Sequence, residues 1–206
     1  MQLRFECHLT GADYVTQQGW LSATLPCCPL HPHGDCGFAR HGTYERVSPP
    51  GTRVARWYCP EGHRTFSLLP DCLAARLSGT LSEVEAVVRA AEQAPSLEAL
   101  CKHQRLDIEL PGALRWVRRR VQDVHGALHR IKGVLGDTFA NVAPTLTAFA
   151  DHLEVEPVLV ALRGIAAAWL DVLPKPLGFA PRRRRGRSAL PRLQHRAGPD
   201  PPGCPA

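Results

Sequence analysis

Six cysteine and histidine side chains gather in one short part of the chain, at spacings typical of metal ligands. Cys27 precedes His31 by the same interval that separates Cys59 from His63. Zn²⁺ in structural sites takes four nitrogen or sulfur ligands in a tetrahedron, and short turns supply them in pairs. We therefore predict one Zn²⁺ ion held by four of the six candidates Cys27, Cys28, His31, Cys36, Cys59 and His63.

The first of the two turns leaves the choice of ligands open. Either Cys27 or Cys28 pairs with His31 or Cys36, and His33 and His41 lie close enough in the sequence to compete. Four protein ligands fill the coordination shell of zinc and leave no position for a substrate. The predicted ion is therefore structural rather than catalytic.

A predicted β-hairpin lies between the two ligand clusters and must position them. Residues 43–47 and 52–58 are rich in β-branched and aromatic residues, and the Ser48-Pro49-Pro50-Gly51 stretch between them favours a turn. A hairpin this short buries too little surface to be stable alone. Because metal binding energy becomes folding energy in such small units, we expect residues 26–70 to form a zinc ribbon.

The remaining composition divides the chain into further regions. We expect an N-terminal segment at residues 1–25, a helical region at 80–173 and a disordered Pro/Arg-rich tail at 174–206. The net charge of +6 resides entirely in the tail from residue 180 onward, so the rest of the chain is neutral. The predicted fold class is α+β, with the small β ribbon followed by an all-α region.

Helix signals are clear after residue 80. Thr80 with Glu83 and Ser82 with Glu85 are two candidate capping boxes for the first helix. Pro95 ends that helix and a shorter one follows. Further helices are expected at about 144–153 and 157–172.

The strongest periodic signal in the chain belongs to the third helix of this region. Its apolar residues recur at helical spacing and define a buried stripe: Leu114, Val117, Val121, Val124, Leu128 and Ile131. Four arginines in its first half, Arg115, Arg118, Arg119 and Arg120, cannot all face inward. An Arg-rich helix suits the DNA major groove, which makes residues 81–131 a helix-turn-helix candidate. The alternative is a merely solvated outer face, and the connection at residues 106–109 is long for that motif.

Other functional classes have little support in the sequence. It contains no nucleotide-binding glycine loop, no zinc-protease motif and no nucleophile elbow, so we expect no enzymatic activity. No charge-free apolar stretch is long enough to span a bilayer, and no membrane partner is expected. The first residues lack the apolar core of a secretion signal, so we expect a cytoplasmic protein with reduced thiols. Four cysteines without a partner at ligand spacing are expected to be core or tail thiols: Cys7, Cys72, Cys101 and Cys204.

Residues 40–70 resemble a bacterial pattern. His41-Gly42-Thr43-Tyr44 and Arg64-Thr65-Phe66-Ser67 match the zinc ribbon that precedes a helix-turn-helix at the N-termini of insertion-sequence transposases, and in short proteins encoded beside them. The second cysteine of that family's later turn would fall at Gly62, and His63 stands one place on. The resemblance covers roughly residues 26–125 and excludes the transposase catalytic domain. It implies double-stranded DNA and a transposase as partners.

The sequence thus supports one leading hypothesis and two alternatives. The leading hypothesis is a non-catalytic DNA-binding protein related to mobile-element transposases, with a structural zinc ion and helix-turn-helix contact to DNA. The first alternative is a zinc-stabilised interaction module that forms a homodimer through the apolar stripe of residues 114–131. The second is an inactive transposase remnant.

Overall fold

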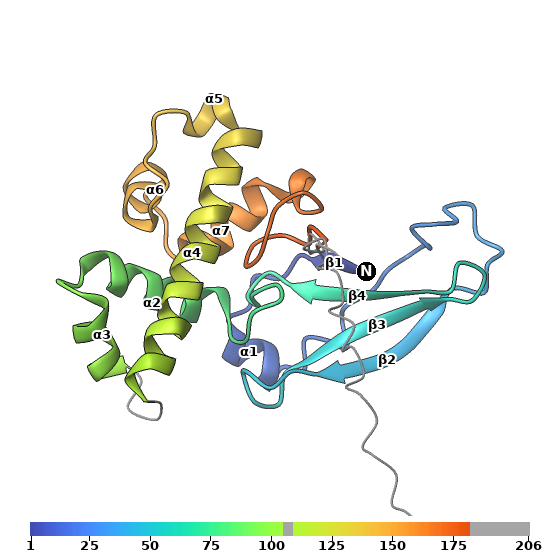
Figure 1. The fold of residues 1–206 in the computed structure, drawn as a ribbon. Coiled ribbons are helices and arrows are strands. Elements are labelled where there is room, and N and C mark those ends of the chain that lie inside the picture. The colour runs from blue at the N-terminus through green and yellow to red at the C-terminus, as the bar shows by residue number, and fades with distance from the viewer. Residues whose placement is uncertain (105–108, 182–206) are drawn as a thin grey trace, which may run out of the picture.

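The computed structural model describes residues 1–104 and 109–181. It confirms the α+β class: a four-stranded sheet lies on one side of the molecule and the helices from α2 onward on the other (Figure 1). In chain order the elements are β1 (Gln2–Phe5), α1 (Gly11–Thr16), β2 (Ala39–Glu45), β3 (Arg53–Cys59), β4 (Arg64–Pro70), α2 (Leu81–Gln93), α3 (Leu97–Gln104), α4 (Leu110–Val134), α5 (Gly136–Phe139), α6 (Leu146–Leu153), α7 (Val158–Ile165) and a short 3₁₀ helix (Ala167–Trp169).

The sheet contains the predicted hairpin and two further strands. Strands β2 and β3 form the antiparallel hairpin, β4 pairs with β3, and β1 adds to β4 in parallel at the edge. Residues 1–25, expected as a separate segment, therefore supply β1 to the same sheet as the ribbon, together with α1. The Tyr14 hydroxyl of α1 donates a hydrogen bond to the Arg53 carbonyl oxygen, 3.1 Å away, so α1 also packs on this sheet.

Both faces of the sheet are covered at its centre. Val54 and Ala55 are neighbours on β3 and point to opposite faces, yet both are fully buried. Val54 packs near Tyr14 and Trp20, whereas Ala55 packs near Ala23. This two-sided burial explains why the strand sequence does not alternate cleanly between apolar and polar residues.

Helix α2 organises the helical region through its carboxylates. Thr80 and Glu83 form the predicted capping box, since each side chain accepts a hydrogen bond from the backbone N–H of the other residue. Glu85 has a different role from the one predicted. Its carboxylate accepts hydrogen bonds from the backbone N–H groups of Val158 and Leu159 and so caps α7.

A second carboxylate of α2 holds the next helix in the same way. Glu92 accepts hydrogen bonds from the backbone N–H groups of Leu146 and Thr147 at the start of α6, and from the ring of His125 on α4. These bonds lower the pKa of Glu92 against the opposing effect of burial, which is the larger single influence. The helical region is thus joined by charged caps as well as by apolar packing.

The apolar stripe of α4 is used inside the protein. Val124, Leu128 and Ile131 are buried in the main core, and Val117 packs with Cys101 of α3. Helix α4 packs against both α2 and α3. The stripe that would form the seam of a homodimer is therefore already covered by the same chain.

Arginine side chains join the sheet to the helices at residues 70–80. Arg163 of α7 is fully buried, and its guanidinium donates hydrogen bonds to five backbone carbonyl oxygens, those of Pro70, Asp71, Leu73, Pro176 and Leu177. Burial lowers the pKa of Arg163 to about 10, which leaves it charged at neutral pH.

The first residues of the predicted disordered tail are ordered in the structure. Residues 174–181, expected within the disordered tail, pack against the protein, and Pro176, Leu177 and Gly178 are buried. Gly178 lies so close to the Leu173 carbonyl oxygen that a Cβ atom would stand 2.2 Å from it. The arginine-rich part of the predicted tail, from residue 182, lies outside the described residues.

Within the described parts of the chain, no helix has the length and apolar character needed to cross a bilayer.

Candidate metal centre and basic helix

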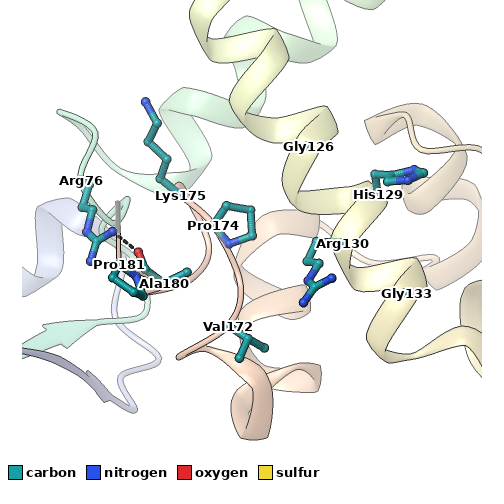
Figure 2. A pocket seen from close by; sticks show the side chains of 10 residues that line it. All are labelled: Arg76, Gly126, His129, Arg130, Gly133, Val172, Pro174, Lys175, Ala180 and Pro181. Atoms are coloured by element: carbon teal, nitrogen blue, oxygen red, sulfur yellow. Dashed lines mark hydrogen bonds between the residues drawn. The ribbon is translucent and has the colours of Figure 1, made fainter. Parts of the chain in front are cut away.

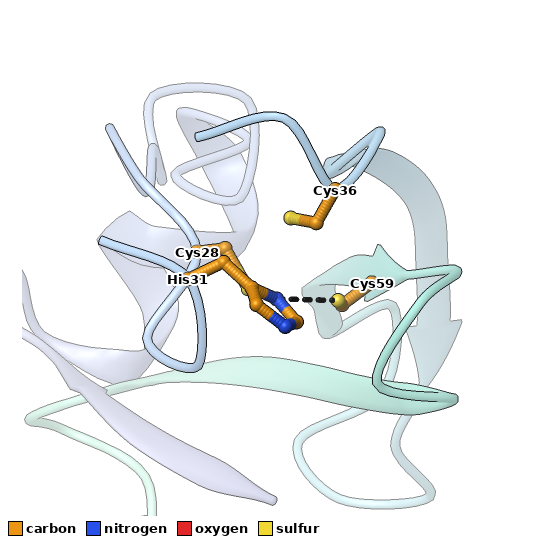
Figure 3. A group of neighbouring side chains, drawn as sticks. All are labelled: Cys28, His31, Cys36 and Cys59. Atoms are coloured by element: carbon orange, nitrogen blue, oxygen red, sulfur yellow. Dashed lines mark hydrogen bonds between the residues drawn. The ribbon is translucent and has the colours of Figure 1, made fainter. Parts of the chain in front are cut away.

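Four of the six predicted ligands meet at one end of the sheet (Figure 3). The ligand atoms of Cys28, His31, Cys36 and Cys59 all lie within 4.8 Å of one another. The first three come from the loop between α1 and β2, and Cys59 is the last residue of β3. The structure therefore brings together a Cys₃His group that can hold a metal ion.

The loop conformation explains how three ligands from nine residues converge. The backbone N–H of His31 donates to the Cys28 carbonyl oxygen at 3.2 Å, which closes a tight turn between these two ligands. Gly34, Asp35 and Gly37 then adopt positive φ angles of 93°, 64° and 64°. Glycine and aspartate tolerate this left-handed region, so the chain reverses there and returns Cys36 toward His31.

The spacing of the ligand atoms suits a tetrahedral ion. The His31 Nδ1 atom lies 3.3 Å from Cys59 Sγ and 3.6 Å from Cys28 Sγ. For zinc, with Zn–S of about 2.3 Å and Zn–N of about 2.0–2.1 Å, a tetrahedron places S and N about 3.6 Å apart. The thiol groups are also buried: Cys28, Cys36 and Cys59 are 2%, 6% and 0% exposed.

The thiols influence one another's ionisation. Burial raises the pKa of Cys28, but hydrogen bonds from the backbone at Leu30 and from His31 outweigh it and lower that pKa to about 7. Burial, together with hydrogen bonds to Cys28 and Cys59, raises the pKa of Cys36 to about 11. Several thiolates crowded together are stable only when a cation offsets their charge, which is the situation that a metal ion creates.

A second layer of contacts orients the ligands. The His31 Nε2 atom faces the Glu61 carboxylate at 3.6 Å, while its Nδ1 atom faces the thiols. A carboxylate on the far side of a ligating imidazole is a common partner in metal sites. The backbone N–H of Gly62 donates to Cys59 Sγ at 3.2 Å, and a Cβ at Gly62 would stand 2.6 Å from Leu30 Cδ1. Glycine therefore allows the close approach of the two loops.

Two of the predicted ligands lie outside the cluster. Cys27 is exposed to solvent. His63 is exposed, has a φ of 46°, and turns its Nδ1 atom toward the Tyr58 hydroxyl at 3.4 Å. The alternatives His33 and His41 are also exposed, and His41 packs against the Tyr58 ring. The expected pairing of ligands, two from each turn, is therefore wrong: three come from the first loop and one from β3.

The other cysteines agree with their prediction where the structure describes them. Cys7, Cys72 and Cys101 are buried thiols. Cys204 lies outside the described residues.

The predicted DNA-contacting arginines separate into two groups. Arg115, Arg118 and Arg119 are exposed on the first half of α4. Arg120 is only 8% exposed, its guanidinium lies 3.7 Å from the centre of the Trp116 ring, and it reaches the Ser78 hydroxyl at 3.4 Å. The inclusion of Arg120 in a DNA surface is therefore wrong, because this position turns toward the buried side of the helix.

The three helices of the predicted helix-turn-helix are present as α2, α3 and α4. Helix α4 is 25 residues long and begins at Leu110, with a proline in its first turn. The connection at residues 106–109 is long for the motif, and its first three residues, 106–108, lie outside the described residues. The prediction that this unit binds DNA is therefore carried by the exposed arginines alone.

Comparison of the chain with known protein families, with curated proteins and with solved structures finds no match.

Proposed function

We propose that this protein is a non-catalytic, double-stranded DNA-binding protein of the cytoplasm, in which a structural zinc ion stabilises the sheet. The observation that carries the proposal is the exposed group Arg115, Arg118 and Arg119 on α4. None of the three forms an ion pair with a residue that the structure describes. Guanidinium groups on the exposed face of a helix, with no ion-pair partner among the described residues, can contact guanine edges and phosphates.

The ligand set favours zinc as the ion. Thiolates select zinc, copper(I) or iron–sulfur clusters, and a mixed set of three sulfurs and one imidazole nitrogen is typical of structural zinc. The four protein ligands complete a tetrahedral shell, which agrees with a structural role. Zinc bound here would join the loop before β2 to the end of β3, and so fix the hairpin.

A relation to insertion-sequence transposases rests on the residue pattern around His41 and Arg64, and the proposal includes a transposase as a protein partner. The three-plus-one division of ligands departs from the paired turns of that family's ribbon. The alternative of a homodimer formed through the α4 stripe has little support, because those side chains pack within the chain.

Salt-dependent DNA binding tests this proposal. Removing one contact to a phosphate lowers the slope of log K against log salt by about one, so Arg118→Ala with Arg119→Ala should lower it by about two. The matched Lys double variant should keep the slope, because it keeps both charges, and should lose sequence preference, because lysine cannot bind guanine in a bidentate manner. Fluorescence anisotropy with a labelled duplex measures both quantities.

One result would contradict the proposed contact. If removing residues 182–206 abolished binding while the Arg118 and Arg119 variants left the slope unchanged, the arginine-rich tail would be the DNA-binding element. Binding would then be non-specific attraction to phosphates.

A further inference from the structure

A second basic site lies farther along the same helix. A cavity of about 580 Å³ opens between the second half of α4 and residues 172–181 (Figure 2). Gly126, Arg130 and Gly133 of α4 form one wall, and Pro174 and Lys175 form the facing wall. Arg76, from the segment that joins the sheet to the helices, borders it beside Ala180.

The charge of the cavity is positive. Arg130 is exposed and has no ion-pair partner among the described residues, and none of the described residues that line the cavity is acidic. Lys175 is neutralised by Asp123, 2.7 Å away, so it contributes little to the net charge. Arg76 donates hydrogen bonds to the carbonyl oxygens of Phe179 and Ala180, which hold its guanidinium at the rim.

The helix wall is open at two positions, Gly126 and Gly133, because glycine carries no side chain. A Cβ atom at Gly126 or Gly133 would meet no other atom within 4 Å. Each glycine costs about 1 kcal/mol of helix stability relative to alanine. A bulky group can therefore approach the α4 backbone between them and lie against Arg130.

The cavity shares its face of α4 with the proposed DNA contacts. Arg119 and Arg130 are eleven residues apart, which is close to three full turns, so both lie on one side of the helix. The rise between them is about 16 Å. A major groove is about 12 Å wide, so a helix that places Arg119 in the groove brings Arg130 to the bordering phosphates.

We infer that this cavity is a binding site for the phosphodiester backbone of the DNA duplex, with Arg130 and Arg76 as the groups that contact phosphate oxygens. This inference rests on the proposed DNA-binding function and names a second, sequence-independent contact for it.

Opposite charges placed at one glycine test the site. Gly126→Glu and Gly126→Lys both replace a helical glycine at an open position, so both should fold at least as well as the parent chain. We expect Gly126→Glu to weaken duplex binding and to make the salt slope shallower by about one. Gly126→Lys should strengthen binding and make the slope steeper by a similar amount. Arg130→Gln should resemble Gly126→Glu.

The control is Ala12→Glu, which makes the same charge change at an exposed position of α1 and should leave the slope unchanged. All variants are made in the full chain, so the tail contributes equally to each. If Arg118 and Arg119 variants reduce the slope but Gly126 and Arg130 variants do not, the cavity inference is wrong and the proposed function stands. If the parent chain does not bind duplex DNA even at low salt, both are wrong.

Discussion

Irregular segments come together at both ends of the sheet, around a group of side chains that can hold a metal ion at one end and around a guanidinium at the other. At one end, Cys28, His31, Cys36 and Cys59 join irregular loops through a shared point suited to a metal ion. At the other, the Arg163 guanidinium joins irregular segments through five carbonyl oxygens. A metal ion bound at the first end would come from solution, whereas the second end carries its cation on a side chain. Only the first should respond to chelators.

The atoms that surround the cation differ in charge between the two ends. Thiolates are charged and soft, so they attract a divalent ion but repel one another without it. Carbonyl oxygens are neutral and already partly oriented by the backbone, so one delocalised charge with five N–H donors satisfies them. A buried arginine is tolerated here because each edge of its guanidinium plane has an acceptor.

Metal removal should have the largest effect, and it should destabilise one end of the sheet while leaving the other unchanged. Zinc binding contributes about 10–16 kcal/mol in small zinc domains. We therefore expect chelation, or Cys59→Ser, to abolish amide hydrogen-exchange protection in residues 26–70 while α2, α6 and α7 stay protected. Hydrogen exchange followed by mass spectrometry measures both regions in one experiment.

Cys27→Ser is the matched control for that experiment, because Cys27 is exposed and lies outside the cluster. It should retain one metal ion per chain and full protection. Unchanged protection of residues 26–70 after complete metal removal would contradict a structural role for the ion.

Arg163→Met should produce the next largest effect, at the opposite end. It removes a buried guanidinium and so takes one donor from each of five carbonyl oxygens, of which those of Pro70 and Pro176 keep a backbone N–H donor. Each buried carbonyl left unsatisfied costs about 1–3 kcal/mol. The free energy of unfolding, measured by urea titration, should fall by at least about 3 kcal/mol. Metal content should stay at the parent value, since this residue lies at the other end of the sheet.

Arg163→Lys should not restore stability, because three donors on a point charge cannot reach five acceptors. Arg130→Gln serves as the exposed control and should leave the unfolding free energy within about 0.5 kcal/mol. Equal stability of the Arg163→Met protein would show that the carbonyl cluster does not depend on the guanidinium.

Glu61→Gln should have the smallest effect, and this effect should be confined to the metal affinity of the Cys₃His group. The carboxylate faces His31 Nε2 at 3.6 Å from an exposed position. Removal of such an outer partner typically lowers metal affinity about 10–100-fold, and exposure places the expectation at about tenfold. Competition with a chromogenic chelator measures it, and Glu45→Gln, an exposed carboxylate paired with Arg53, should leave affinity unchanged.

The Cys₃His group can be predicted from the sequence because its candidate ligands are close together in the chain. All four clustered residues are among the six candidates. The choice among them depends on backbone conformation, namely the reversal at Gly34 and Asp35 and the positive φ of His63. Residue spacing alone does not specify such angles, so it wrongly predicts a pairing of Cys59 with His63.

The Arg163 contacts at the other end of the sheet cannot be predicted, because they connect distant parts of the chain. Arg163 binds carbonyl groups about ninety positions earlier, and backbone carbonyls carry no signature in the sequence. The pairing of β1 with β4 is hidden for the same reason. The apolar stripe of α4, by contrast, correctly indicates the buried face of that helix. Arg120 lies at the margin of this face, and its predicted place on the exposed side is wrong.

The two capping carboxylates of α2 also determine the geometry of the helices beyond it. Glu85 and Glu92 are separated by seven residues, or nearly two turns, so they project from the same side about 10 Å apart. The starting points of α7 and α6 are fixed to that interval. One residue inserted between the two glutamates would rotate the second by about 100° and leave the α6 amides uncapped. The number of residues between Glu85 and Glu92 thus sets the distance between the starts of α7 and α6.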